Sequence, residues 1–120
     1  MTVDELARAV AACDAAAVAR LLASDVVLVS DGGGRVVTPL RPVRGVTVAA
    51  RLVTALGTSG AVPTVEQVNG RPGVVLRRDG RAEAVIAVAL ADAQVIRIWL
   101  VLNPDKLTRW HVVTPGQSSG

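Results

Sequence analysis

The chain has 120 residues, about half of them apolar, and a formal net charge of +3. This length suits one domain rather than two, and the apolar content supports a core without disulfides or metals. Cys13 is the only cysteine and His111 the only histidine, which excludes an intramolecular disulfide and argues against a metal site. The polar, acidic N-terminus and the short apolar runs predict neither a signal peptide nor a membrane span, so we expect a cytoplasmic protein without a membrane partner.

The basic residues do not predict nucleic-acid binding. They are nearly all arginines, they are scattered along the chain, and Phe and Tyr are absent. A surface that binds nucleic acid directly would carry a clustered basic patch, usually with aromatic rings for base stacking. Arg77, Arg78 and Arg81 are the nearest approach to a cluster, and we expect them on an exposed hairpin.

The N-terminal half has the spacing of three helices. A capping box opens the chain, and Leu6, Val10 and Cys13 then recur on one helical face, which predicts that Cys13 lies in the core. Asp14 is suited to cap a second helix over residues 14–22. Further expected elements are a strand over 26–30, a glycine turn over 31–35, a short strand over 36–38 and a third helix over 46–56, ended by Gly57.

The C-terminal half has the pattern of an antiparallel meander. Strands are expected over 64–68, 73–77, 81–90 and 94–102, joined by turns that include Asn69-Gly70 and Asp79-Gly80. Helices followed by a meander predict an α+β fold, with three N-terminal helices on one face of the sheet. We expect a single domain over residues 1–110 and a flexible tail over 111–120.

The last strand has two contrasting faces. Ile96, Ile98, Leu100 and Leu102 alternate on one face, which predicts core, whereas the other face mixes valines with Arg97, Trp99 and Asn103. The strand over 81–90 has no clearly hydrophilic face either. An antiparallel sheet with one solvent-exposed face should carry more polar side chains on that face. The sequence therefore predicts that both faces are covered, the second one by a sheet-to-sheet homodimer.

Three segments, taken in order, resemble a known family. They are Asp31-Gly32-Gly33-Gly34-Arg35, Val68-Asn69-Gly70-Arg71-Pro72-Gly73 and Asn103-Pro104-Asp105-Lys106-Leu107. Together they are similar to the SnoaL-like domain at the C-terminus of a group of extracytoplasmic-function sigma factors. The resemblance implies a nuclear transport factor 2-like cone of helices and curved sheet over residues 3–107.

The resemblance also implies a regulatory role. In that family the domain contacts the sigma domains that hold promoter DNA and core polymerase, and Asn103, Asp105 and Lys106 belong to a signature segment. The family usually has Lys where this chain has Arg35. No sigma domains and no helix-turn-helix are visible here, so a sigma factor or RNA polymerase would be a partner in trans. The start of the sequence favours a free-standing protein over an excised domain.

Related cone folds include isomerases, cyclases and epoxide hydrolases that use enclosed carboxylates. Asp31, with Arg35 assisting, is the best candidate for such chemistry, although the sequence favours the simpler role in which Asp31 accepts backbone N–H bonds in its glycine turn. The sequence lacks the Tyr that would serve as an oxyanion donor and implies no cofactor. A small isomerase, cyclase or hydrolase acting on a hydrophobic small molecule in the cone is therefore the alternative function.

Trp99 is the outstanding apolar residue of a chain with two aromatic side chains. In a central strand it predicts either a pocket wall or an interface anchor, and Arg97 on the same face favours the interface. The sequence therefore favours a non-catalytic ligand-binding or protein-interaction module whose contact residues are Arg97, Trp99, Asn103, Asp105 and Lys106.

Overall fold

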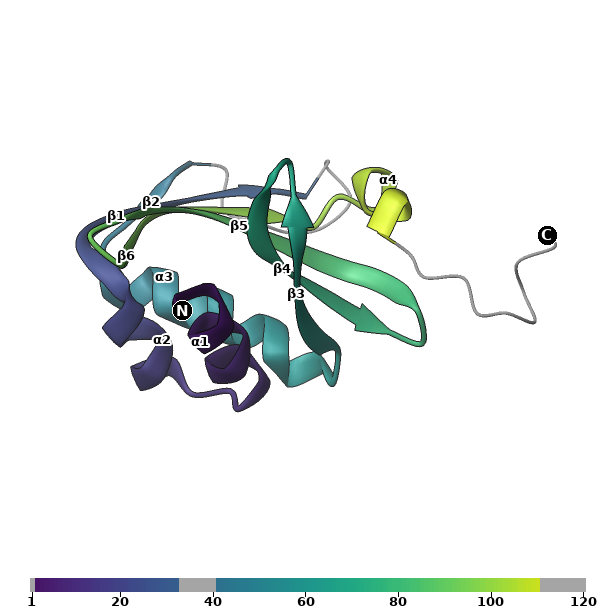
Figure 1. Cartoon of the computed structure of the whole chain (residues 1–120), viewed down its shortest axis with the longest axis horizontal. Coiled ribbons are helices and arrows are strands. Elements are labelled where there is room, and N and C mark those ends of the chain that lie inside the picture. Colours follow the sequence, from purple (N-terminus) through teal and green to yellow (C-terminus); the bar gives the residue numbers. More distant parts are fainter. Residues whose placement is uncertain (1, 33–40, 111–120) are drawn as a thin grey trace, which may run out of the picture.

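The computed structural model describes residues 2–32 and 41–110. Three helices lie on one side of a curved sheet and a short fourth helix lies on the other side (Figure 1). The elements in chain order are α1 (Thr2–Ala11), α2 (Ala15–Leu21), β1 (Leu22–Asp31), β2 (Val43–Arg44), α3 (Val46–Ala55), the 3-10 turn η1 (Leu56–Ser59), β3 (Val62–Val68), β4 (Arg71–Arg78), β5 (Arg81–Ala91), β6 (Gln94–Val101), α4 (Pro104–Leu107) and the 3-10 turn η2 (Thr108–Trp110). The expected strand over 36–38, Arg35 and the tail over 111–120 lie outside the described residues.

The six strands form one mixed sheet in the order β2-β1-β6-β5-β4-β3. Every neighbouring pair is antiparallel except β1 and β6, which run parallel. Strands β3 to β6 are the expected meander, and β1 joins it beside the last strand. The predicted α+β class, with three N-terminal helices on a curved, mostly antiparallel sheet, is confirmed. The short helix α4 was not expected.

The main core lies between α1–α3 and the inner face of the sheet. It consists of small aliphatic side chains, and the largest fully buried ones include Leu6, Leu28, Ile86 and Ile98. Each such side chain contributes about 1.5–3 kcal/mol through removal from water. Valines and alanines from the helices fill the remaining space, so the inside of the curved sheet is a packed core.

A β-bulge changes the predicted faces of β6. Ala89 pairs with Arg97 but Leu90 pairs with Val95, so Ile96 is an extra residue on β6. Val95 is consequently fully buried, whereas Ile96 is 40% exposed. The prediction that Ile96 belongs to the core was wrong, because strict alternation does not continue through a bulge.

Cys13 does not lie in the core. It is exposed and has φ of 53° in the turn after α1. The amide of Asp14 donates to the carbonyl of Ala9 and that of Cys13 to the carbonyl of Val10, both at 3.0 Å. This is the hydrogen-bond pattern of a Schellman motif, in which the left-handed residue is usually glycine.

The predicted cap of α2 is confirmed, since the Asp14 carboxylate accepts from the amide of Ala17 at 3.0 Å.

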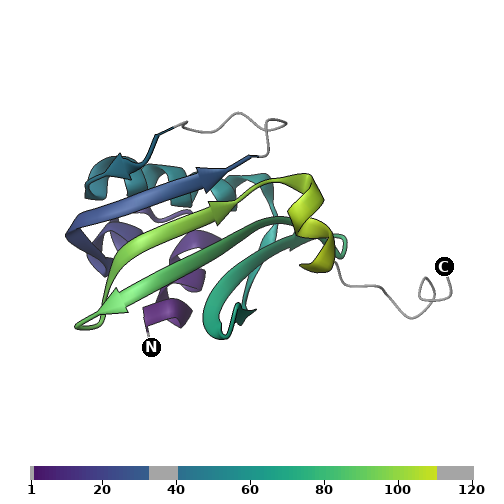
Figure 2. The same ribbon diagram turned by 90° about the horizontal axis from the view of Figure 1, so that it is seen from above.

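The outer face of the sheet is partly covered by the chain itself. Leu107 of α4 is buried against Val68, Val75, Ala82 and Val85. Figure 2 looks onto this outer face and shows α4 lying across one end of the strands. The rest of the outer face, which carries Trp99, is not covered by any helix that the structure describes.

Candidate functional site

The first and third of the resembling segments meet at one end of the sheet. Asp31 ends β1 and pairs in register with Val101 of the parallel strand β6. The amide of Leu102 donates to the carbonyl of Asp31 at 2.8 Å, and β6 then turns into α4. Lys106 therefore lies beside Asp31, with 2.5 Å between its Nζ and Asp31 Oδ2, although the residues are 75 positions apart.

Asn103 shapes the turn that places Lys106. Its side-chain oxygen accepts from the amide of Asp105 at 3.1 Å, which caps α4, and Pro104 occupies the first helical position. Asp105 and Lys106 consequently project from α4 as exposed side chains. The predicted contact residues of this segment thus form one surface, which includes Asp31.

The surroundings of Asp31 do not resemble those of a catalytic carboxylate. Its side chain is 36% exposed and forms an ion pair with Lys106, whose side chain is 62% exposed. A general acid or base in this kind of fold relies on an enclosed site that removes water from the carboxylate. Arg35, the expected assisting residue, lies outside the described residues.

The second resembling segment lies next to the same surface. Asn69 and Gly70 have φ of 51° and 81° and form the tight turn between β3 and β4. Val68 and Asn69 line a hollow of about 450 Å³ together with Asp105, Lys106 and Trp110. We call this the α4 hollow. All three resembling segments therefore converge at this end of the sheet.

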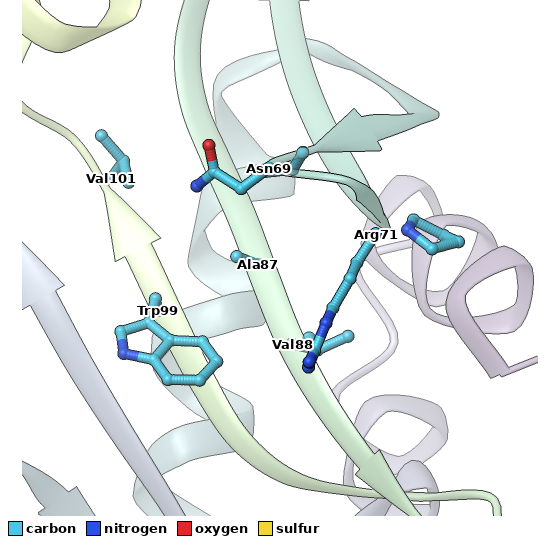
Figure 3. Close-up of a pocket in the computed structure, with 8 residues that line it drawn as sticks. Asn69, Arg71, Ala87, Val88, Trp99 and Val101 are labelled. Carbon is cyan, nitrogen blue, oxygen red and sulfur yellow. The ribbon is translucent and has the colours of Figure 1, made fainter.

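A second groove adjoins the α4 hollow on the outer face. It has a volume of about 400 Å³, and we call it the Trp99 groove. Its lining residues are Val68, Asn69, Arg71, Pro72, Ala87, Val88, Trp99 and Val101. Figure 3 shows the ring of Trp99 on one side of β5 and the side chain of Arg71 reaching toward β5 from the other side, near Val88.

The Trp99 groove arises where two strands separate. Strand β4 pairs with β5 only as far as Val74 and Ile86, yet β5 continues to Ala91. Pro72 precedes this point and lacks an N–H for the ladder. On the other side of β5 the small side chain of Ala87 pairs with Trp99, so the indole stands above its neighbour. The apolar floor is therefore open for two reasons: β4 separates from β5 on one side, and the large Trp99 stands beside the small Ala87 on the other.

Cationic side chains flank the Trp99 groove. The guanidinium carbon of Arg97 lies 5.8 Å from the centroid of the Trp99 ring, within the range of a cation–π contact. Arg71 and Arg97 are both exposed, and neither has a carboxylate partner among the described residues. Trp99 is itself 37% exposed. The structure thus brings Arg97 and Trp99 together, as predicted, beside a groove that adjoins the α4 hollow rather than at the Asp31–Lys106 pair itself.

Arg77 is not the exposed hairpin residue expected from the sequence. Its side chain is only 15% exposed because it pairs with Glu66, with 2.7 Å between Arg77 Nη2 and Glu66 Oε1. Its Nε also donates to the carbonyl of Trp110 at 2.7 Å. This hydrogen bond connects η2 to strand β4 of the sheet. The hydrogen bonds from Arg77 lower the pKa of Glu66 and outweigh its slight burial.

Sequence reasoning missed Arg71 and Asn69 as site residues. Both were assigned to a turn, and only their proximity in space to Trp99 and α4 gives them a role. The signal that pointed there was the second resembling segment. Within residues 2–32 and 41–110 no cluster of three metal-ligating side chains occurs, and no helix is long and apolar enough to cross a bilayer.

Comparison with known proteins relates this chain to a sigma factor. It is 33% identical over 120 residues to the ECF RNA polymerase sigma factor SigJ of Mycobacterium tuberculosis, a match that covers 88% of this chain and 38% of SigJ. The crystal structure of SigJ aligns with a TM-score of 0.67 over 89% of this chain and 43% of that one. The chain thus spans about two-fifths of the relative's length. No protein-family model matches.

More distant structures show the same fold. An NTF-2-like protein of unknown function from Burkholderia xenovorans aligns at 16% identity with a TM-score of 0.56, covering 98% of this chain and 88% of that one. An epoxide hydrolase of Mycobacterium tuberculosis aligns at 13% identity with a TM-score of 0.54, covering 92% and 86%. The predicted resemblance is confirmed: the chain has the fold of these nuclear transport factor 2-like structures, and its sequence is similar to part of an extracytoplasmic-function sigma factor.

Proposed function

We propose that this chain is a non-catalytic interaction module that regulates transcription in the cytoplasm by binding an extracytoplasmic-function sigma factor. The observation that carries the proposal is the convergence of Asp31, Asn69 and Lys106, one from each resembling segment, around the α4 hollow. The parallel pairing of β1 and β6 places Asp31 beside Lys106, and both side chains remain exposed. Residues from all three segments are therefore available at this end of the sheet for contact with a partner.

The packed interior supports an interaction role over catalysis. The space between α1–α3 and the sheet is filled by aliphatic side chains, and Asp31 lies outside it, exposed and paired with Lys106. The small-enzyme alternative would need a substrate cavity beside an enclosed acid or base. We therefore place the function at the outer surface of the fold, where Asp31 and Lys106 are accessible to a protein.

The test is direct binding to a sigma factor. The probe is SigJ truncated to remove the region that this chain matches, titrated with the intact chain in a calorimeter at low salt. We expect a dissociation constant of about 1–50 μM, typical of transient signalling contacts. Lys106→Glu should weaken binding by at least about tenfold, because it reverses the charge at the surface. Arg8→Glu, an exposed reversal on α1, should leave it unchanged.

Two results would overturn the proposal. The first is the absence of binding at 100 μM chain, on the order of a hundredfold above the tight end of the expected range. The second is turnover of an apolar epoxide, lactone or enone by the chain alone, abolished in Asp31→Asn. That result would establish the enzyme alternative with Asp31 as acid or base.

A further inference from the structure

The Trp99 groove adjoins the surface just assigned to sigma-factor binding and shares Asn69 with it, but Trp99 and Arg97 have no part in that assignment. It is an apolar trench on the outer face, and its walls belong to β6 and to the β3–β4 turn. Trp99 is exposed although it is one of two aromatic residues in the chain. An exposed Trp in an apolar hollow is a common anchor point for a binding partner.

The groove is part of a longer trench. It shares Trp99 with a hollow of about 530 Å³ at Asp25, Arg44 and Arg97, and it shares Val68, Asn69 and Val101 with the α4 hollow. The outward residues Arg97, Trp99 and Val101 span ~13 Å of β6, at ~6.6 Å between successive side chains. The rise from residue i to i+4 of a helix is ~6 Å. A helix lying along β6 would therefore match this floor over about two turns.

The fold already covers the neighbouring half of this face in the same way. At the far end α4 lies on the sheet, and Leu107 is buried in one cluster with Val68 and Val85. The exposed half has the same kind of aliphatic floor, formed by Ala87 and Val101 beside Trp99. A second apolar helix placed next to α4 would complete the layer.

The charged residues around the trench indicate which kind of partner it would bind. The three hollows are lined by the cations Arg44, Arg71, Arg97, Lys106 and Arg109 and by the carboxylates Asp25 and Asp105. Lys106 is paired with Asp31, and the four arginines still outnumber the two lining carboxylates. A second copy of this chain, docked by a two-fold axis, would present the same cationic patch to itself. Juxtaposed like charges oppose such an interface, whereas an acidic partner is attracted.

We infer that the Trp99 groove binds an acidic amphipathic helix of a partner protein, with apolar side chains on Trp99 and Val101 and carboxylates on Arg71 and Arg97. Helix-in-groove recognition of this kind reads apolar anchors at i, i+3 or i+4 and i+7. Arg71 and Arg97 lie on opposite sides of the floor, so they fix the register of two acidic residues. This inference deepens the proposed function by specifying a second contact on the same partner.

The experiment uses the intact chain and two synthetic peptides of about eleven residues, the length of a three-turn helix. Both carry leucines at i, i+4 and i+7; one has Glu at the flanking positions and the other has Lys. The indole emission of a Trp110→Phe variant reports binding at Trp99. We expect the Glu peptide to bind with a dissociation constant of about 10–200 μM, and the Lys peptide at least about tenfold more weakly.

Charge reversal distinguishes charge-specific binding of the peptide from nonspecific hydrophobic binding. The double variant Arg71→Glu/Arg97→Glu should prefer the Lys peptide, and Trp99→Ala should lose at least about tenfold in affinity for the Glu peptide, measured by calorimetry. Val48→Ala, which removes an exposed apolar side chain on α3, should change nothing. Thermal unfolding of each variant checks that the fold is retained.

Three outcomes would overturn the inference. Equal binding of the two peptides would show that charge has no part. No binding of either peptide would show that the groove takes no helix. A dimer in sedimentation that Trp99→Ala dissociates would assign the face to a second copy. If Lys106→Glu abolishes binding to truncated SigJ while the Trp99 and Arg71/Arg97 variants bind it normally, the proposed function stands and this inference fails alone.

Discussion

Lys106 forms an ion pair with Asp31 that joins the end of β1 to α4, with 2.5 Å between Nζ and Oδ2. Both side chains are at least one-third exposed, so water and salt screen the attraction between them. The pair contributes little to folding on this ground. Its location, at the meeting point of two resembling segments, fits the contact role proposed above.

The first prediction separates these two roles. Lys106→Gln should lower the free energy of unfolding by less than about 1 kcal/mol, as is usual for exposed pairs. Urea denaturation at low and high salt measures this, and the difference from the unmodified chain should shrink at high salt. A loss well above this range would show that the pair has a structural role and would weaken its assignment to binding.

The fold could be predicted from the sequence because helix spacing, capping residues and turn residues all indicate the same elements. The meander from β3 to β6, the cap at Asp14 and the helix α3 all follow from local spacing and turn chemistry. The wrong predictions concern single residues at which the helical or strand periodicity of the side chains is interrupted. The bulge at Ile96 and the left-handed turn at Cys13 each move a side chain from the predicted core to the surface.

The candidate site was predictable only in part. Asp31, Lys106 and Trp99 were singled out by the resemblance and by rarity of residue type. That Lys106 meets Asp31 follows from the parallel pairing of β1 and β6, which no local pattern encodes. The Trp99 groove arises from the early separation of β4 and β5, which is likewise a property of the assembled sheet.

The second prediction concerns Cys13. Its φ of 53° lies in the left-handed region, which costs an L-residue roughly 1–2 kcal/mol and glycine almost nothing. Cys13→Gly should therefore raise the free energy of unfolding by about 1 kcal/mol, measured by urea denaturation. Cys13→Ala, which keeps the strain, is the matched control and should change stability little. Destabilisation by glycine would contradict the role of Cys13 in ending α1.

The third prediction compares two glycines that follow α3. Gly57 does not end the helix through a left-handed turn, as the sequence predicted; it lies within η1, where a Cβ would collide with the backbone carbonyl of Val10. Gly60 has open space around it but φ of 87°. Gly57→Ala should cost about 2–3 kcal/mol, because overpacking would force α1 and η1 apart.

Gly60→Ala should cost less, roughly 1 kcal/mol, because only the backbone conformation is strained. Thermal unfolding of both variants gives the comparison. Equal losses at the two positions would contradict the close approach of η1 to α1.

The last prediction concerns pH and the attachment of η2. Arg77 lowers the pKa of Glu66 from its ordinary value of 4.5, and Arg78 lowers the pKa of Glu83 in the same way. A carboxylate with a depressed pKa in the folded state stabilises the fold above the pKa of the unfolded chain. That contribution disappears as the pH falls through the folded pKa. Stability should therefore decrease as the pH is lowered below about 4.5.

Glu66→Gln tests this because it removes the titrating group and leaves an amide of similar shape. Its free energy of unfolding should be lower than that of the unmodified chain at pH 7, by about 1 kcal/mol for a half-buried bidentate pair, and the difference should disappear as the pH falls through the lowered pKa of Glu66. Glu83→Gln, in the more exposed pair, should show a smaller difference. Because Arg77 also binds the carbonyl of Trp110, Glu66→Gln should loosen η2 and, in a Trp99→Phe background that leaves Trp110 as the only indole, increase quenching of Trp110 fluorescence by acrylamide. Unchanged quenching would show that Arg77 holds η2 without help from Glu66.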